Sequence, residues 1–231
     1  MENKERKENY RKLKKFALDQ GLSLFGVADI TSIRDEFLLD KKLRERFDRG
    51  ISLGKELIDS VVEDIIDRPT SLYFHHYRQL NFFLDRAAFL LSSFIQESGF
   101  RTLPIPASQV IDWEKHKGHL SHKKVGQLAG LGWIGRSGLL VNPQFGARFR
   151  LVTVLTDLPL ETDEALEDGC GICRKCLAPC PARAIGEKKE DFDLAACFEK
   201  LKEFRKEGIV GQYICGVCVK ACSGLKRTQS R

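Results

Sequence analysis

The first 169 residues contain no cysteine, although the whole chain has eight. The sequence also lacks any apolar run that approaches the ~20 residues needed to cross a bilayer. Its N-terminal segment, MENKERKENYRKLKK, is highly charged and lacks the apolar middle section of a secretory signal. These absences argue against a membrane partner and lead us to expect a cytoplasmic protein.

The bulk composition is that of an ordinary globular protein, with 231 residues, 42% hydrophobic and 30% charged. The formal net charge is +6. This excess of positive charge is modest for a chain of 231 residues. The basic composition is therefore weak evidence for nucleic-acid binding.

All eight cysteines lie between Cys170 and Cys222. The first half reads Cys170-Gly-Ile-Cys173-Arg-Lys-Cys176-Leu-Ala-Pro-Cys180-Pro181. This is the C-x2-C-x2-C-x3-C-P spacing of bacterial ferredoxins, in which the first three thiolates hold one cubane cluster and the fourth ligates another. Pro181 also suits the start of a short helix over Ala182 to Ile185.

The second half completes the count of ligands. It has C-x2-C-x3-C spacing from Cys215 to Cys222, and Cys197 stands alone on an expected helix from Leu194 to Glu207. One cluster then takes Cys170, Cys173, Cys176 and Cys222, and the other takes Cys180, Cys197, Cys215 and Cys218. The alternatives are a disulfide framework, which suits small secreted domains, and two zinc sites, for which this spacing is unusual. We therefore predict two 4Fe–4S clusters and a redox role.

Before residue 160 the hydrophobic pattern alternates between helices and strands. A basic helix with an apolar face from Tyr10 to Ala17 is expected to end at Gly21. Further helices are expected over Asp35–Arg49, Tyr77–Ser98 and Leu120–Leu128, and strands over Leu22–Ala28, Ile51–Leu53 and Phe149–Thr156. The pattern predicts an α/β domain over residues 1–158 and a cluster domain over 159–231, with an acidic connection over Glu161–Gly169.

A glycine-rich segment runs from Ala129 to Gly146. Its glycines permit backbone conformations closed to other residues and close approach of a bulky ligand. Gly130, Gly132 and Gly135 match G-x-G-x-x-G, but an expected helix precedes them instead of a strand. We therefore reject a dinucleotide-binding fingerprint.

The histidines form two patches, one of them near two acidic side chains. The first patch is His75 and His76, and the second is His116, His119 and His122, near Asp112 and Glu114. The second patch has the residue types of a proton-donating or metal-binding face. The alternative is that each histidine is solvated or serves a structural purpose.

Two stretches of sequence carry a family resemblance. AGLGWIGRSGLLVNPQFGARFRLVTVLTDLPL, followed by CGICRKCLAPCPARAI and CGVCVKAC, resembles the epoxyqueuosine reductase family and, more distantly, the reductive dehalogenases. The N-terminal LKKFALDQGLSLFGVADI is similar to the opening of that family. The resemblance implies an α+β fold, with a nitroreductase-like α/β domain that holds base-off cobalamin beside a bacterial ferredoxin-like domain with two 4Fe–4S clusters.

The resemblance also implies roles for individual residues. It places eight residues near the corrinoid: Gly130, Gly132, Trp133, Gly135, Arg136, Ser137, Gly138 and Asn142. The family's acid lies in an aspartate-threonine-glycine motif that is not intact here; Asp112 is the nearest candidate, with His119 and His122 as alternatives. Electrons would come from a low-potential donor of the ferredoxin or flavodoxin type, and the cluster ligands agree with the grouping above.

We therefore expect an iron–sulfur oxidoreductase that passes electrons through two clusters to cobalamin and then to a small molecule or modified nucleoside. Such an enzyme needs a pocket of roughly several hundred cubic ångströms in its first domain. The family continues into helical repeats that help hold tRNA, whereas this sequence ends nine residues after Cys222, so tRNA is a secondary expectation. The alternatives are an electron-transfer or corrinoid-reactivating module without its own substrate, and a tRNA queuosine-pathway reductase.

Overall fold

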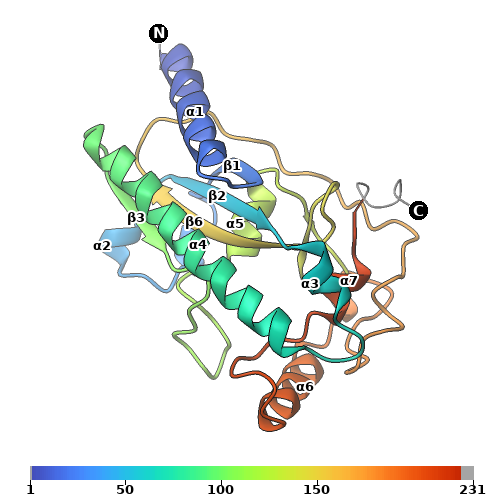
Figure 1. Ribbon diagram of the computed structural model, residues 1–231. Helices are drawn as coiled ribbons and strands as arrows, with labels where there is room; N and C mark the ends of the chain where they lie inside the picture. Colours follow the sequence, from blue (N-terminus) through green and yellow to red (C-terminus); the bar gives the residue numbers. More distant parts are fainter. Residues whose placement is uncertain (1, 225–231) are drawn as a thin grey trace. The chain divides into compact units, whose positions relative to one another are not determined.

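The computed structural model describes residues 2–224 and has a mixed helix-and-sheet (α+β) fold (Figure 1). In chain order its elements are α1 (Glu2–Asp19), β1 (Leu24–Asp29), η1 (Arg34–Glu36), α2 (Lys41–Arg44), β2 (Arg49–Glu56), α3 (Asp59–Glu63), α4 (Ser71–Glu97), β3 (Thr102–Ile105), α5 (His122–Leu128), β4 (Trp133–Ile134), β5 (Leu140–Val141), β6 (Phe149–Thr156), η2 (Lys189–Asp191), α6 (Leu194–Lys206) and α7 (Val217–Ala221). These elements form two compact units. Unit 1 contains residues up to 55, 81–131 and 150–166, and unit 2 contains residues 56–80, 132–149 and those from 167 onward.

Unit 1 is built around a four-stranded sheet with the order β1-β2-β6-β3. β1 pairs antiparallel with β2, from Leu24 opposite Gly54 to Asp29 opposite Arg49, and β3 pairs antiparallel with β6. Because side chains alternate along a strand, one face of the sheet is apolar and packs against α1 and α4. The core on this face includes Leu13, Ala17, Val27, Leu53, Leu84, Leu91 and Val154.

Helix α5 and the residues that follow it pack against the opposite face of the sheet. A Cβ added at Gly50 would lie 2.8 Å from Cγ2 of Ile30 and 3.0 Å from Cγ1 of Val125. A Cβ added at Gly26 would lie 2.1 Å from the carbonyl oxygen of Ala129. The missing side chains on β1 and β2 therefore allow the helix to approach the sheet backbone closely.

Most elements expected from the hydrophobic pattern are confirmed. β6 covers the expected residues 149–156, and α6 begins at the expected Leu194. Gly21 follows the end of α1 in a left-handed conformation, with φ +85°. α4 begins at Ser71, six residues before the expected Tyr77, because the Thr70 hydroxyl accepts the N–H of Tyr73 and caps the helix.

Two expected helices are wrong. The segment 35–49 contains only the short η1 and α2, and Asp40 starts α2 by accepting the N–H of Lys42 at 2.9 Å. Arg49 already belongs to β2, where it pairs with Asp29. The expected helix over residues 182–185 is a turn, because Arg183 has φ +50°, which a right-handed helix does not accommodate.

Unit 2 joins α3, the first part of α4, the β4–β5 pair and the cysteine segment. Arg148 links several of these parts, and its side chain is only 5% exposed. Its guanidinium donates to Asp59 at 3.3 Å, to Glu63 at 2.7 Å, and to the Lys220 carbonyl. The Lys220 ammonium donates to the carbonyls of Glu63 and Ile65. These bonds fix α7 against α3.

The predicted boundary between residues 158 and 159 stays a prediction. In the structure the glycine-rich residues 132–149 group with the cysteine segment in unit 2. Residues 225–231 of the predicted second domain lie outside the described part of the chain. None of the helices formed by residues 2–224 is long and apolar enough to span a membrane.

Candidate functional site

The eight cysteines lie in unit 2 and carry thiols that are not joined in disulfides within the described residues. The first four lie on consecutive tight turns, where the N–H of Cys173 donates to the Cys170 carbonyl at 2.8 Å. Cys197 lies on α6, Cys218 on α7, and Cys215 and Cys222 lie on either side of α7. Turns and short helices thus bring distant parts of the sequence into one unit.

The Cys222 thiol belongs with the thiols of the first cysteine loop. Burial raises its pKa to about 11. Three cysteine thiols are close enough to raise that pKa further, and they are Cys176, Cys170 and Cys173. Burial likewise raises the pKa of Cys176, and Cys170 and Cys173 add to the shift. These four thiols are those of the first predicted ligand set, which stays a prediction.

The Cys218 thiol is the centre of the other group. Burial raises its pKa well above the usual range, and the thiols that raise it further are Cys215, Cys197 and Cys180, followed by Cys176. Burial also raises the pKa of Cys215 to about 11, with Cys197 and Cys180 as its cysteine neighbours. Cys180 therefore lies with the later cysteines, although it is only four residues from Cys176.

Within residues 2–224, no three histidine, cysteine, aspartate or glutamate side chains are grouped so that they could hold one metal ion. A cubane cluster spreads its four thiolates over four iron atoms, so it does not require such a group. Thiolates are the ligands of both clusters and zinc, and the raised pKa values mean that loading either would release protons.

The glycine-rich segment packs against the cysteine segment of the same unit. A Cβ added at Gly135 would lie 3.2 Å from the Cys170 sulfur. A Cβ added at Gly146 would lie only 2.1 Å from the carbonyl oxygen of Cys222, and Gly146 has φ +60°. Gly135 was predicted to allow the close approach of a large ligand. In the structure, close approach to the chain's own cysteine segment already accounts for Gly135 and Gly146.

Two side chains of the glycine-rich segment hold the first cysteine loop. The Trp133 indole N–H donates to the Cys170 sulfur, with 3.3 Å between Nε1 and Sγ. The Arg136 guanidinium donates to three carbonyls, those of Gly171, Cys173 and Glu187. Its positive charge also lowers the pKa of Cys176, against the larger effect of burial. Both residues were predicted as corrinoid contacts, and nothing in the sequence pattern indicated their role beside the cysteines.

Among the remaining predicted corrinoid residues, several are buried and two, Gly130 and Gly138, are partly exposed. Ser137 and Asn142 are buried, with 6% and 7% exposure, and the Asn142 amide oxygen accepts the N–H groups of Gln144 and Phe145. Gly132 is buried against the carbonyl of Val141. Gly130 lies in unit 1, whereas the other predicted corrinoid residues lie in unit 2. Gly138 packs against the ring of Phe192, 2.9 Å from an added Cβ.

The candidate proton donors lie in unit 1. The Asp112 carboxylate accepts the N–H groups of Glu114 and Lys115 and stabilises a tight loop. The Nδ1–H of His119 donates to the Leu38 carbonyl at 3.3 Å. His122 is held at both ring nitrogens, since Nε2–H donates to the carbonyl of Pro106 and Nδ1 accepts from the Thr153 hydroxyl.

The environment of His122 keeps its ring neutral. Burial lowers its pKa to about 4, a hydrogen bond to the Pro106 carbonyl opposes that shift, and the charge of Arg150 adds to it. The geometry of His122 therefore favours a structural role in joining the start of α5 to β6. The exposed His116 has φ +53° and lies in the loop that Asp112 begins.

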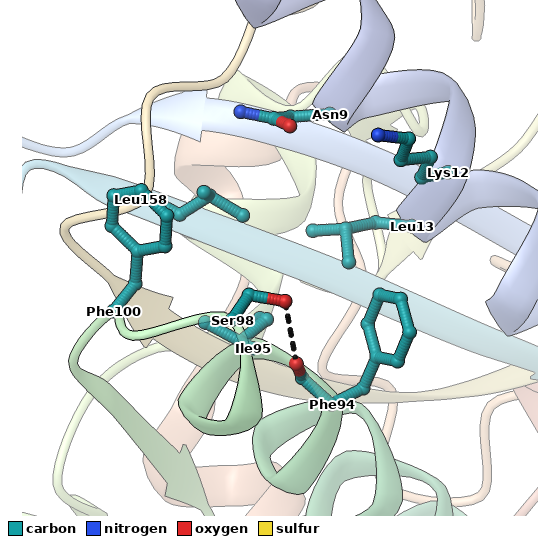
Figure 2. Close-up of a pocket in the computed structure, with 8 residues that line it drawn as sticks. All are labelled: Asn9, Lys12, Leu13, Phe94, Ile95, Ser98, Phe100 and Leu158. Atoms are coloured by element: carbon teal, nitrogen blue, oxygen red, sulfur yellow. Dashed lines mark hydrogen bonds between the residues drawn. The ribbon is translucent and has the colours of Figure 1, made fainter.

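Unit 1 contains a pocket of about 350 Å³ between α1 and the end of α4. Figure 2 shows the residues that line it, which are Asn9, Lys12, Leu13, Phe94, Ile95, Ser98, Phe100 and Leu158. Its volume is of the size expected from the sequence. Its described lining residues nevertheless include neither the predicted corrinoid contacts nor the candidate proton donors.

Solved structures of two kinds of protein have a fold similar to that of this chain. Over 94% of this chain, the fold resembles that of a reductive dehalogenase whose structure suggests a mechanism for B12-dependent dehalogenation. The TM-score is 0.76, at 18% identity and over 32% of that protein. The fold also resembles that of an epoxyqueuosine reductase bound to an epoxyqueuosine-modified tyrosine tRNA stem loop. That TM-score is 0.58, at 20% identity, over 93% of this chain and 64% of the other.

The curated relatives with similar sequences are named epoxyqueuosine reductase. The chain is 32% identical over 112 residues to the epoxyqueuosine reductase of Bacillus anthracis. This match covers 46% of the chain and only 30% of the relative. No protein family model matches the sequence. The predicted resemblance to epoxyqueuosine reductases and reductive dehalogenases is confirmed, although the dehalogenase, predicted as the more distant relative, has the higher TM-score.

Proposed function

We propose that this chain is an iron–sulfur oxidoreductase of the queuosine pathway type. Two 4Fe–4S clusters would carry electrons from a low-potential ferredoxin- or flavodoxin-type donor to a cobalamin, for the reduction of a modified nucleoside. A small molecule is the alternative substrate. Relatives named epoxyqueuosine reductase and the neighbour with an epoxyqueuosine-modified tRNA stem loop support this substrate class. The B12-dependent dehalogenase with the same fold supports the corrinoid.

One observation carries the proposal. The cysteine neighbours that raise the thiol pKa values of Cys222 and Cys215 agree with the two groups of four that ferredoxin spacing predicts, and the neighbours of Cys218 include Cys176 as well. One cluster would be held by Cys170, Cys173, Cys176 and Cys222, and the other by Cys180, Cys197, Cys215 and Cys218. The thiol of Cys176 also raises the pKa of Cys218, which supports a short path between the two proposed clusters. We propose that the second domain, residues 159–231, is ferredoxin-like for this reason.

The residues fit the clusters well. Each cluster, when bound, supplies one-electron transfer, and its ligands must be deprotonated thiolates. Arg136 places a positive charge beside the first group and fixes the loop that carries Cys170 and Cys173. The bonds from Arg148 to α3 and to Lys220 hold the helix that carries Cys218. These contacts would keep the ligands in place as electrons pass.

The residues fit cobalamin only in part. Ser137 and Asn142 are buried within the protein, so they are poorly placed to touch a large ligand. Trp133 and Arg136 are engaged with the cysteine loop. The corrinoid proposal therefore rests on the relatives, and we derive no step through it. The nitroreductase-like character of the first domain, residues 1–158, has the same basis.

For the proton we propose Asp112, with His119 as the alternative. Two backbone N–H groups fix the orientation of the Asp112 carboxylate. His122 is less suited, because both of its nitrogens are engaged and its ring stays neutral. Replacing Asp112 by asparagine should abolish substrate reduction and leave cluster reduction by a chemical donor unchanged.

A second candidate function has a specific observation in its favour. Ile172, between the first two cysteines, is 94% exposed, and Cys173 is also exposed. An exposed apolar residue beside a cluster ligand suits brief contact with another redox protein. The chain would then be an electron-transfer or corrinoid-reactivating module, without a substrate of its own.

The test is anaerobic purification followed by iron, sulfide, cobalt and zinc analysis and visible spectroscopy, before and after cobalamin is added. We expect about eight irons and eight sulfides per chain and a base-off cobalamin spectrum. Iron without corrinoid binding favours the electron-transfer module. A colourless protein with about two zincs refutes the proposal.

Single and double cysteine variants sharpen this test. Cys176→Ser and Cys180→Ser should each lose one cluster, and the two lost clusters should differ in their electron paramagnetic resonance signals. Cys180→Ser combined with Cys197→Ser should lose no more iron than either change alone, because both belong to one group. Cys176→Ser combined with Cys180→Ser should lose both clusters. Equal losses in the two double variants would contradict the grouping.

A further inference from the structure

The indole of Trp133 is held in a fixed position beside Cys170. Trp133 lies on β4, where it pairs with Val141 of β5. Its six-membered ring packs on Gly169, where an added Cβ would lie 2.7 Å from Cη2 and 2.8 Å from Cζ2. The residue before Cys170 must therefore be small for the ring to occupy this place. The indole N–H then points at the Cys170 sulfur, with 3.3 Å between Nε1 and Sγ.

This contact joins an uncharged donor to a proposed cluster ligand. Reduction adds one electron to the cluster, breaks no bond, and makes the sulfurs more negative. A hydrogen bond to a charged acceptor is stronger than one to a neutral acceptor. The indole N–H therefore stabilises the reduced state more than the oxidised state, which raises the reduction potential.

We propose that Trp133 is a positioning residue that raises the reduction potential of the cluster held by Cys170, Cys173, Cys176 and Cys222. This inference rests on the proposed function, because it requires the cluster. It goes further by giving Trp133 a role within unit 2 that needs no corrinoid contact. It also makes the two clusters unequal, since the donor reaches a ligand of only one of them.

The experiment is anaerobic potentiometry of the full chain, followed by electron paramagnetic resonance, with dithionite as the reductant. Trp133→Phe keeps an aromatic ring and removes the N–H. We expect the midpoint potential of one cluster to become more negative, with the other unchanged. At the original midpoint, the ratio of reduced to oxidised cluster should fall several-fold. Unchanged potentials, or a shift to more positive values, would overturn the inference.

The chain offers a matched control in its only other tryptophan. Trp113 lies in unit 1 and is 59% exposed, so Trp113→Phe should leave both potentials unchanged. Gly169→Ala is the second variant, for the case that Trp133→Phe binds less iron. Its methyl group keeps the indole but displaces it, so the same cluster should shift in the same direction.

The two proposals fail in different ways. If the unaltered protein contains no iron or sulfide after anaerobic reconstitution, the proposed function fails, and the inference with it. Suppose that the unaltered protein, Trp133→Phe and Gly169→Ala each contain both clusters. If the two variants then keep the reduction potentials of the unaltered protein, only the inference fails. If Trp113→Phe shifts a potential as far as Trp133→Phe does, the effect is not due to the N–H bond, and the inference also fails.

Discussion

Replacing Gly146 by alanine tests the close contact between the glycine-rich segment and the last cysteine. Gly146 and Asn142 exchange two backbone hydrogen bonds, of 2.7 and 2.8 Å, and the next residue, Ala147, donates its N–H to the Cys222 carbonyl at 3.0 Å. The new Cβ would lie 2.1 Å from that carbonyl oxygen and 2.6 Å from the nitrogen of Gly224. These are backbone atoms and cannot rotate away, so the two segments must separate by about 1 Å to reach ordinary contact distance.

The cost has two parts. An alanine at φ +60° costs about 1 kcal/mol in backbone conformation. Separation also breaks the bond from Ala147 and leaves buried polar groups unsatisfied, which costs about 2 kcal/mol more. We therefore expect Gly146→Ala to lower the free energy of unfolding by about 3 kcal/mol, and to reduce the iron held by the group that contains Cys222.

Gly208→Ala separates these two parts. Gly208 follows α6 in the same unit with φ +78°, and an added Cβ there would meet nothing within 4 Å. This control carries only the conformational cost, about 1 kcal/mol, and should keep its iron. Urea unfolding followed by circular dichroism measures both variants. If Gly146→Ala is no less stable than Gly208→Ala, the two backbones do not meet as described.

Three further changes have distinct readouts. Because the His122 pKa is about 4 when folded and near 6.5 when unfolded, only the unfolded state gains the proton between these values, so stability falls on acidification. Between pH 7 and 5 the free energy of unfolding should fall by about 2 kcal/mol, and His122→Gln should remove this pH dependence. An equal fall in the variant would contradict the assignment to His122. Arg148→Met should lower the free energy of unfolding by about 2 kcal/mol, a moderate cost because the carboxylate partners of Arg148 are half-exposed. Arg174→Met removes only an exposed ion pair and should leave the free energy of unfolding almost unchanged. Equal urea midpoints for the two variants would contradict the stabilising role of Arg148. Asp163→Asn should bring the raised pKa of Tyr10 closer to 10, as measured by ultraviolet absorption at high pH, because burial remains but the negative charge is gone; an unchanged titration would contradict the hydrogen bond between them.

Sequence patterns predicted the parts of this fold that local periodicity controls. The β-branched run of β6 and the apolar stripe of α4 each signal one buried face, and both elements are observed. β3 was missed because it is short and contains Pro104, which is typical of an edge strand and weakens the signal. Its place is determined by pairing with β6, which is distant in sequence.

The cysteine spacing predicts two ligand sets because ligand geometry restricts spacing so strongly, and the neighbours of the Cys222 and Cys215 thiols are consistent with these sets. The roles of Trp133 and Gly146 could not be predicted in this way, because each depends on a partner found only after folding. The same holds for His122, which its residue type makes an alternative proton donor, because its partners Pro106 and Thr153 are found only after folding. Residue type suggested its chemistry, but its neighbours decide which form it takes.

The distribution of the cysteines has a consequence for biosynthesis. Each proposed ligand set contains a member from the last cysteine segment, Cys218 in one and Cys222 in the other. A ribosome therefore completes both sets of ligands only within a few residues of each other, long after it has released the loop that begins at Cys170. A nascent chain that stalls before Cys215 would carry five of the eight cysteines and could complete neither proposed ligand set. Cluster delivery would then follow translation of this segment instead of accompanying it.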